Sequence, residues 1–158
     1  MKKTLIVILS IILISFIYTR MDKSPSVKAV SEELLDWKSE GDYFNYKGHD
    51  IFYQDTGDKS KKAIMFLHGY PTSSYDWHLI WSELASDYRL ITMDMLGFGF
   101  SDKPDITYSI SMQADIFEIL LEDLEITNIN LVSHDYGDNV AQELLARNFE
   151  RQQANPIK

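Results

Sequence analysis

The spacing of apolar residues changes several times along the chain and predicts alternating strands and helices. An apolar run at 63–67 and mostly apolar runs at 89–93 and 129–132 are typical of strands that are buried on both faces of a parallel sheet. Over 77–84 and 111–124 the apolar residues instead recur three or four positions apart, as on one face of a helix. Strands that alternate with helices in this way predict a parallel α/β sheet.

A different pattern precedes this region. Residues 42–46 and 49–54 alternate aromatic or apolar with polar side chains, and the Lys-Gly pair between them suits a tight turn, so we expect a β-hairpin. A short amphipathic helix is expected before the hairpin, over 31–38, with Ser31 as its N-cap. The side chains that we expect to pack against the domain are Leu34, Leu35 and Trp37.

Residues 1–20 form a pattern of their own. A leading Lys-Lys pair precedes an uncharged run, 4–18, that is rich in Ile and Leu and is followed by Arg20. Such a run is short for a bilayer span of about 20 residues and long for a signal-peptide core, and no small-x-small cleavage site follows it closely. We therefore expect an uncleaved, single-pass membrane anchor, with secretion after cleavage as the alternative, followed by a linker at 21–30.

Composition narrows the classes of partner. The chain of 158 residues has room for one domain, and a hydrophobic content of 45% is enough to bury a core. The formal net charge is −9, and because residues 1–28 hold five basic residues and one acid, the remainder carries 10 basic and 23 acidic residues. This balance argues against nucleic acid as a partner. The absence of cysteine excludes disulfides, thiolate metal sites and cysteine nucleophiles.

Candidate chemistry lies at 131–140, where a strand pattern stops at small and polar residues and a helical pattern begins. The middle residue of this strand-turn-helix is Asp135, framed by Ser133 and Gly137, which are small enough to let neighbouring backbone approach. A carboxylate at a helix N-terminus is held ionised and is able to attack carbon. The alternative is that Asp135 is an ordinary helix N-cap, and the decapeptide by itself leaves both interpretations open.

The strand at 63–67 runs directly into a loop that begins at His68. Gly69 permits an unusual backbone conformation and Pro71 fixes the turn, so the loop is able to aim backbone N–H groups at a site above the strand ends. For His68 taken alone, an ordinary turn residue is the simpler interpretation.

A second loop, 95–104, follows the strand at 89–93. Its two glycines suggest a phosphate loop, but no helix begins after the second glycine and no Gly-Lys-Ser/Thr follows. We expect instead a compact loop that packs Phe98 and Phe100 beside the site.

Three motifs in this order, HGYP at 68–71, GFGFSDKP at 97–104 and SHDYG at 133–137, resemble the α/β-hydrolase superfamily, in the branch of epoxide hydrolases and haloalkane dehalogenases. The resemblance covers roughly residues 35–148. It implies an α/β-hydrolase fold that needs neither a cofactor nor a metal.

The resemblance also implies roles for particular residues. Asp135 matches the nucleophile, which forms an alkyl ester that a histidine-activated water hydrolyses. The backbone N–H groups of Tyr70 and Tyr136 match the oxyanion hole. The positions that match the supporting loops are His68, Gly69, Pro71, Ser133 and Gly137.

At two positions, Tyr70 and Tyr136, the residue type differs from that of many haloalkane dehalogenases. In many dehalogenases Asn stands at the position of Tyr70 and Trp at that of Tyr136, and both donate an N–H to the departing halide. Neither donor is present here. The expected partner is therefore a small apolar electrophile of the epoxide or ester-like kind.

The largest departure is after the nucleophile, where the family places its catalytic acid and histidine. Only 23 residues follow Asp135, and 148–158 has neither a strand pattern nor a histidine. The cap domain that shapes the family's substrate pocket is missing as well. We therefore expect the N-terminal part of such a hydrolase at 31–150, inactive alone, with a non-native-looking tail at 151–158. The alternative is a non-catalytic, membrane-tethered binding module or an unstable remnant.

Overall fold

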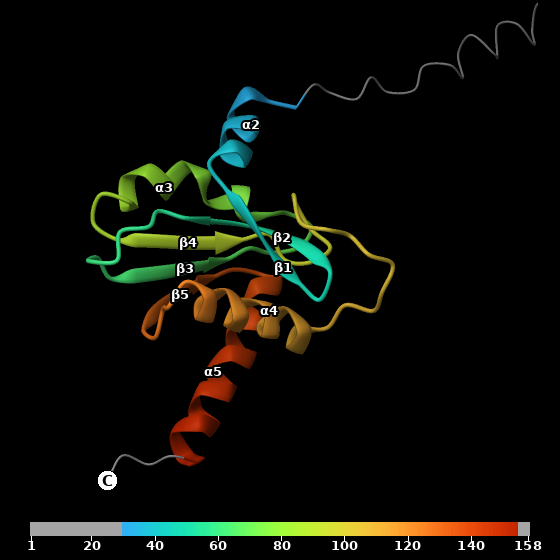
Figure 1. Cartoon of the computed structure of the whole chain (residues 1–158), viewed down its shortest axis with the longest axis vertical. Helices are drawn as coiled ribbons and strands as arrows, with labels where there is room; N and C mark the ends of the chain where they lie inside the picture. Colours follow the sequence, from blue (N-terminus) through green and yellow to red (C-terminus); the bar gives the residue numbers. More distant parts are fainter. Residues whose placement is uncertain (1–29, 155–158) are drawn as a thin grey trace, which may run out of the picture. The chain divides into compact units, whose positions relative to one another are not determined.

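The computed structural model describes residues 30–154, which fold around a five-stranded mixed sheet (Figure 1). The strand order is β1-β2-β4-β3-β5, in which β1, β2 and β4 pair antiparallel and β4, β3 and β5 pair parallel. The predicted α/β architecture with an N-terminal hairpin is confirmed. In chain order the elements are α2 (Glu32–Ser39), β1 (Asp42–Tyr46), β2 (His49–Asp55), β3 (Ala63–Leu67), the 3₁₀ helix η1 (Ser74–Trp77), α3 (His78–Leu84), β4 (Arg89–Met93), α4 (Ile110–Asp123), β5 (Ile129–Ser133) and α5 (Tyr136–Ala154).

The strands agree closely with the sequence pattern. β3 and β4 have the expected bounds, and β5 ends one residue later than expected. In the hairpin Tyr46 pairs with His49, and the turn residues Lys47 and Gly48 have φ angles of 51° and 90°. A two-residue turn with both φ angles positive matches the twist of the flanking strands, which explains why a Lys-Gly pair marks it.

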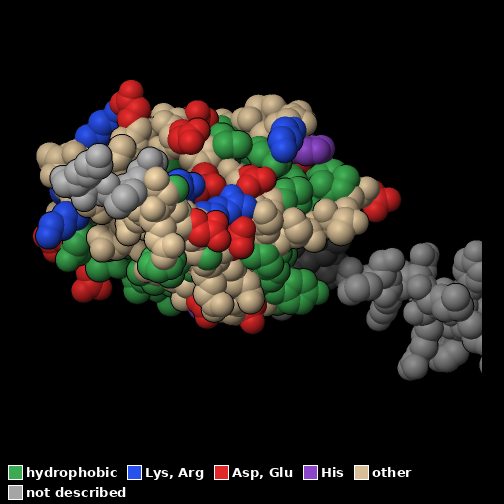
Figure 2. Space-filling model, turned by 90° about the horizontal axis from the view of Figure 1, so that it is seen from below, with side chains coloured by type: hydrophobic (Ala, Val, Ile, Leu, Met, Phe, Trp, Pro, Cys, Tyr) green, Lys and Arg blue, Asp and Glu red, His purple; other side chains and the backbone are tan. Residues whose placement is uncertain are grey.

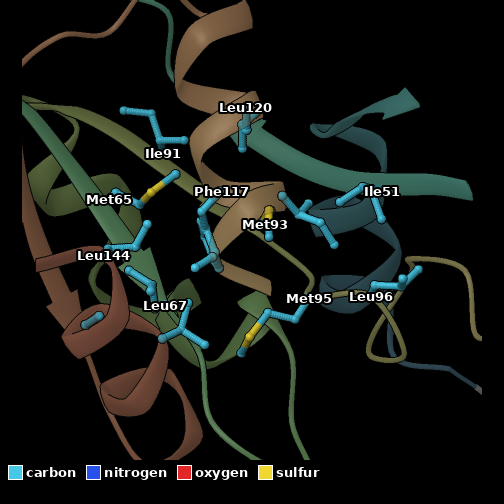
Figure 3. Packing of buried hydrophobic residues seen from close by; sticks show 14 of the residues in the cluster. Ile51, Met65, Leu67, Ile91, Met93, Met95, Leu96, Phe117, Leu120 and Leu144 are labelled. Atoms are coloured by element: carbon cyan, nitrogen blue, oxygen red, sulfur yellow. The ribbon is translucent and has the colours of Figure 1, made fainter. Parts of the chain in front are cut away.

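One hydrophobic core lies between the sheet and the helices α4 and α5. Figure 3 shows Met65 and Leu67 of β3 in the same interior as Phe117 of α4 and Leu144 of α5. The alternate residue of β3, Phe66, belongs to a second core on the opposite face of the sheet. Because both faces are covered, the central strands carry apolar runs rather than alternating patterns.

The second core is rich in aromatic side chains. Trp37 of α2 and Trp81 of α3 meet edge to face with their ring centroids 5.3 Å apart, and Phe66 lies 5.8 Å from Trp81. Leu35, which was expected to pack against the domain, is 51% exposed, so that prediction is wrong. Ile80, one of the apolar residues that recur at helical spacing over 77–84, is 39% exposed. Both helices are short, and the large indole rings fill the contact that the smaller side chains were expected to make.

A charged network fixes α5 against α4. Arg147 on α5 lies 2.8 Å from Asp115 and 2.8 Å from Glu118, both on α4, and 2.9 Å from Glu143 on its own helix. Burial disfavours the charged guanidinium, but the hydrogen bonds that it donates to these carboxylates raise the pKa of Arg147. Figure 2 shows Lys and Arg atoms bordered by Asp and Glu atoms near the middle of the face seen from below. The network restrains α5, whose first residue, Tyr136, directly follows Asp135.

The expected membrane anchor at 1–20 lies outside the described residues, as do nearly all of the linker at 21–30 and the end of the tail at 151–158. Within residues 30–154, no helix has the combination of length and hydropathy that crossing a bilayer requires. α5 continues to Ala154, four residues beyond the boundary expected at 150.

Candidate active site

The turn between β5 and α5 raises Asp135 at the carboxyl end of the parallel strands. Asp135 has a φ angle of 52°, in the left-handed region that residues other than glycine seldom adopt. The turn is closed by hydrogen bonds from the Gly137 N–H to the His134 carbonyl and from the Asp138 N–H to the Asp135 carbonyl, each 3.0 Å long. The strand-turn-helix predicted at 131–140 is therefore present, with Asp135 exposed at its centre.

Two backbone N–H groups converge on one oxygen of the Asp135 carboxylate. Oδ1 accepts hydrogen bonds from the N–H of Tyr70, at 2.8 Å, and from the N–H of Tyr136, at 2.6 Å. These two bonds, with that of Tyr70 the larger influence, hold the pKa of Asp135 below its ordinary value. Within residues 30–154, no donor forms a hydrogen bond with Oδ2. The carboxylate is thus ionised and has one oxygen held and one open.

This geometry differs from that of an ordinary helix N-cap. A capping side chain accepts the N–H of the second or third helical residue, and its own backbone is extended. Asp135 instead accepts the N–H of Tyr136, the first helical residue, and that of Tyr70, 65 residues away, from a left-handed backbone. The N-cap interpretation does not account for these contacts.

Two glycines let the backbone segments meet at this turn. A Cβ added to Gly69 would lie 2.8 Å from the Cβ of Asp135, and one added to Gly137 would lie 2.5 Å from the carbonyl oxygen of Leu67. Both distances are too short for a side chain to be accommodated. Ser133 at the end of β5 donates its hydroxyl to Asp138 Oδ1 at 2.6 Å. Of the two small residues predicted to frame Asp135, Gly137 therefore does allow close approach of neighbouring backbone.

His68 is a buried residue that joins two loops. Its Nδ1 lies 2.8 Å from the carbonyl of Gly69, and its Nε2 accepts the N–H of Met95 at 2.9 Å. Burial lowers the pKa of the imidazole. A neutral ring that donates from Nδ1 and accepts at Nε2 satisfies both contacts. The buried ring of His68 therefore links the backbone of its own loop, at Gly69, to that of the next loop, at Met95. In the same loop, Pro71 is exposed and the Tyr70–Pro71 bond is cis.

Asp94, which sequence reasoning did not single out, is the buried anchor of both loops. Its Oδ1 accepts the N–H of Ser74 at 2.7 Å and its Oδ2 accepts the N–H of Phe100 at 2.6 Å. Gly99 has a φ angle of 45°, and a Cβ there would lie 2.0 Å from Asp94 Oδ2. An acidic residue directly after a buried strand was the available signal, since a buried carboxylate must find donors nearby.

Phe98 forms an aromatic wall beside Asp135. Its ring centroid lies 5.3 Å from that of His68, 6.2 Å from that of Tyr70 and 6.0 Å from that of Tyr136. The prediction that the loop at 95–104 packs Phe98 beside the site is thereby confirmed. For Phe100 it is wrong, because that ring lies 5.2 Å from Phe52 in the aromatic core on the other face of the sheet.

Two hollows lie away from Asp135. One of about 300 Å³ is lined by residues of the hairpin and of the start of α4, including Tyr46 and Met112. Another of about 460 Å³ lies at the opposite end of β3, next to Ala63 and Arg89. Neither of these two hollows is lined by Asp135.

Comparison with known families gives one clear match. The sequence profile of the family described as alpha/beta hydrolase fold matches residues 62–156, which include both loops and the turn at Asp135.

Curated relatives match over 60% or more of the chain. A mesoderm-specific transcript homolog protein from Homo sapiens is 55% identical over 124 residues, which are 75% of this chain and 37% of that protein. A haloalkane dehalogenase from Agrobacterium fabrum is 40% identical over 95 residues, which are 60% of this chain and 31% of that protein. The chain thus spans about a third of the length of these relatives.

Solved structures resemble the described fold. A haloalkane dehalogenase loop variant from Bradyrhizobium elkanii has 37% sequence identity and a TM-score of 0.63, over 68% of this chain and 36% of that one. An alpha/beta hydrolase fold protein from Burkholderia ambifaria has 32% identity and a TM-score of 0.62, over 68% and 39%. The likeness therefore covers about two thirds of this chain.

Proposed function

Since this chain belongs to the α/β-hydrolase fold family, we propose that Asp135 is the nucleophile of a hydrolase that acts on small apolar electrophiles of the epoxide or ester-like kind. One observation carries the proposal. The N–H of the next residue, Tyr136, and the N–H of Tyr70, 65 residues before Asp135, bind the same oxygen of an exposed, ionised carboxylate.

The chemistry follows from the difference between the two oxygens. Oδ2, which has no donor within residues 30–154, attacks a carbon of the substrate and forms the C–O bond of an ester. With an epoxide, the ring C–O bond breaks, its electron pair stays on the ring oxygen, and that alkoxide takes a proton from water. Oδ1 becomes the carbonyl oxygen of the ester and stays on the N–H groups of Tyr70 and Tyr136. The same two donors stabilise the oxyanion when the ester carbonyl is later attacked.

The aromatic surroundings support a small apolar substrate. The ring of Phe98 meets the rings of both Tyr70 and Tyr136, the two residues whose N–H groups bind Asp135. Several relatives are named haloalkane dehalogenases, whose substrates are also small and apolar. Tyr70 and Tyr136 replace the side-chain N–H donors that many of those enzymes direct at the halide. An epoxide or activated ester, whose leaving oxygen takes a proton from water, is therefore the favoured electrophile.

Hydrolysis of the ester requires a base that activates water. Within the described residues, His68 is enclosed and His134 is bonded to Asp76. His49 lies on β2, and His78 at the start of α3 has its Nδ1 2.7 Å from the carbonyl of Tyr75. We therefore propose that the described residues carry out ester formation, the first half of the reaction.

We expect the full chain to form one covalent adduct with a small terminal epoxide such as epoxyhexane, and to react more slowly with bromohexane. Intact-mass spectrometry distinguishes the two reactions, because the epoxide adds its whole mass whereas the bromide loses HBr. Peptide mapping should place the added mass on Asp135. Faster reaction with the bromide would contradict the substrate preference, and the absence of any adduct would favour the non-catalytic alternative.

We further propose that the apolar run at 4–18 anchors the chain in a membrane. Ile12→Arg places a charge at the centre of this run, at an insertion cost of about 2.5–3.5 kcal/mol. We expect the unchanged chain to stay with membranes through alkaline carbonate washing, and the arginine variant to be released. Ile12→Leu is the matched control. Retention of the arginine variant to the same extent as the leucine variant would contradict the proposal.

A further inference from the structure

A side-chain bridge joins the turn that bears Asp135 to the loop that bears Tyr70. His134, the residue before Asp135, places its Nε2 2.9 Å from Oδ2 of Asp76 in η1. The two residues are 58 positions apart, so the contact exists only in the folded chain. Because a carboxylate only accepts hydrogen bonds, Nε2 carries the proton in this pair.

Asp76 is in turn connected to the residues around Tyr70. The hydroxyl of Thr72 donates to Oδ2 of Asp76, the oxygen that also accepts from His134. The N–H of Thr72 donates to the carbonyl of Gly69 at 3.3 Å, which closes the backbone around Tyr70. A continuous set of hydrogen bonds therefore runs from the turn at Asp135 to the segment that supplies the Tyr70 N–H.

The ring of His134 is held on two other sides. Trp77 meets it edge to face, with ring centroids 5.2 Å apart and an angle of 69° between the planes. A Cβ on Gly69 would lie 2.9 Å from its Nδ1, so the absent side chain at Gly69 leaves the space that the ring occupies. His134 is thereby fixed in the orientation that directs Nε2 at Asp76.

The two donors to Asp135 differ in what places them. Tyr136 follows Asp135 directly, so the turn itself fixes its N–H. Tyr70 belongs to a loop 65 residues earlier, so its N–H reaches Oδ1 only if that loop is held against the turn. The bridge between His134 and Asp76 lies between these two segments.

We propose that His134 and Asp76 are positioning residues that hold the loop of Tyr70 against the turn, so that the Tyr70 N–H stays on Oδ1 of Asp135. This inference rests on the proposed function, because it assigns to the bridge the placement of one of the two oxyanion-stabilising donors. The bridge does not contact Oδ2 of Asp135, the proposed attacking oxygen, and takes no part in bond formation.

The test follows the amide resonances of Tyr70 and Tyr136 through an acid titration of the isotope-labelled full chain in a non-ionic detergent. In the unchanged protein both amides should shift together as Asp135 is protonated, with a midpoint below the ordinary aspartate range. In His134→Ala the Tyr70 amide should stop responding while the Tyr136 amide still responds. The midpoint should also move upward, since one hydrogen bond to the carboxylate is lost.

Two further variants separate the hydrogen bond from the charge of His134, which also acts on Asp135. The amide of His134→Gln reaches about as far as Nε2 and should restore the response of Tyr70. The amide of His134→Asn reaches only as far as Nδ1 and should not. Both remove the histidine charge, so a difference between them reports the bridge. His49→Gln, on β2, is the control for loss of a histidine elsewhere.

An unchanged Tyr70 response in His134→Ala and His134→Asn would overturn the positioning proposal, as would equal behaviour of the Gln and Asn variants. Loss of the Tyr70 response in Ala and Asn with recovery in Gln supports it. Adduct formation by the unchanged chain is measured separately and decides the proposed function. The two proposals therefore fail by different observations.

Discussion

Asp135→Asn lowers the rate of adduct formation with the epoxide probe by roughly 10³-fold or more, a scale typical of removing a nucleophile. The amide has the shape of the carboxylate, and its oxygen is still able to accept the N–H groups of Tyr70 and Tyr136. The fold should therefore persist while the attacking group is lost. Intact-mass spectrometry over time measures the rate, and circular dichroism checks that the variant is folded.

Asp138→Asn is the matched control for Asp135→Asn, because Asp138 is an exposed acid in the first turn of the same helix. It should react at nearly the unchanged rate. If Asp135→Asn is alkylated as fast as Asp138→Asn, the nucleophile assignment is wrong.

The pH dependence gives a second reading of the same prediction. The hydrogen bonds from Tyr70 and Tyr136 lower the pKa of Asp135, so the carboxylate is ionised at and above the ordinary aspartate value of about 3.9. With bromohexane, which does not itself titrate, the rate should stay constant from about pH 8 to about pH 5 and decline only when Asp135 is protonated. The same two hydrogen bonds stabilise the folded state at pH values above the ordinary pKa of aspartate. This contribution is lost as the pH falls through the lowered pKa of Asp135. A steep change in rate between about pH 6 and 7 would indicate a histidine nucleophile instead.

Asp94→Ala should lower the free energy of unfolding by about 2–6 kcal/mol, because it leaves the buried N–H donors that face it without an acceptor, at about 1–3 kcal/mol each. These donors belong to Ser74 and Phe100, on the two loops that flank the candidate site. Native domains have a total stability of only about 5–15 kcal/mol. Urea unfolding of the full chain, followed by tryptophan fluorescence, measures the change.

Asp102→Ala is the control for this variant. Asp102 lies in the loop at 95–104 and accepts the N–H of Asp50 at 2.9 Å. Because Asp102 is exposed, water replaces the acceptor that the substitution removes. Its effect should stay below about 1 kcal/mol. Equal effects of the two variants would show that Asp94 is not the anchor of these loops.

The elements of this fold were largely predictable because their signals are local. The apolar runs at 63–67 and 89–93 gave the bounds of β3 and β4, and the Lys47–Gly48 pair marked the hairpin. The errors concern side chains such as Leu35, which is exposed, and Phe100, which packs on Phe52 on the other face of the sheet. Their positions depend on how the large rings of other elements fill each core. Spacing along a helix or loop does not contain that information.

The turn at Asp135 could also be predicted from sequence, since a strand, small residues and a helix follow one another within ten positions. The placement of Tyr70 came from resemblance to a family and not from any pattern in the chain. The sequence did not indicate the contact between His134 and Asp76 or the bonds of Asp94 to the loops. These side chains bind segments that are distant in sequence or unmarked by any motif.

By itself the sequence determined where the backbone turns and that Asp135 lies in the turn between β5 and α5. This was possible because φ preferences and apolar spacing act over a few neighbouring residues. Only the tertiary structure decided that the N–H of Tyr70 meets Oδ1 of Asp135, and that His134 and Asp94 tie the surrounding loops together. These contacts form when parallel strands bring their carboxyl ends to one edge of the sheet. The distances between such groups depend on packing across the whole domain, which no local stretch of residues specifies.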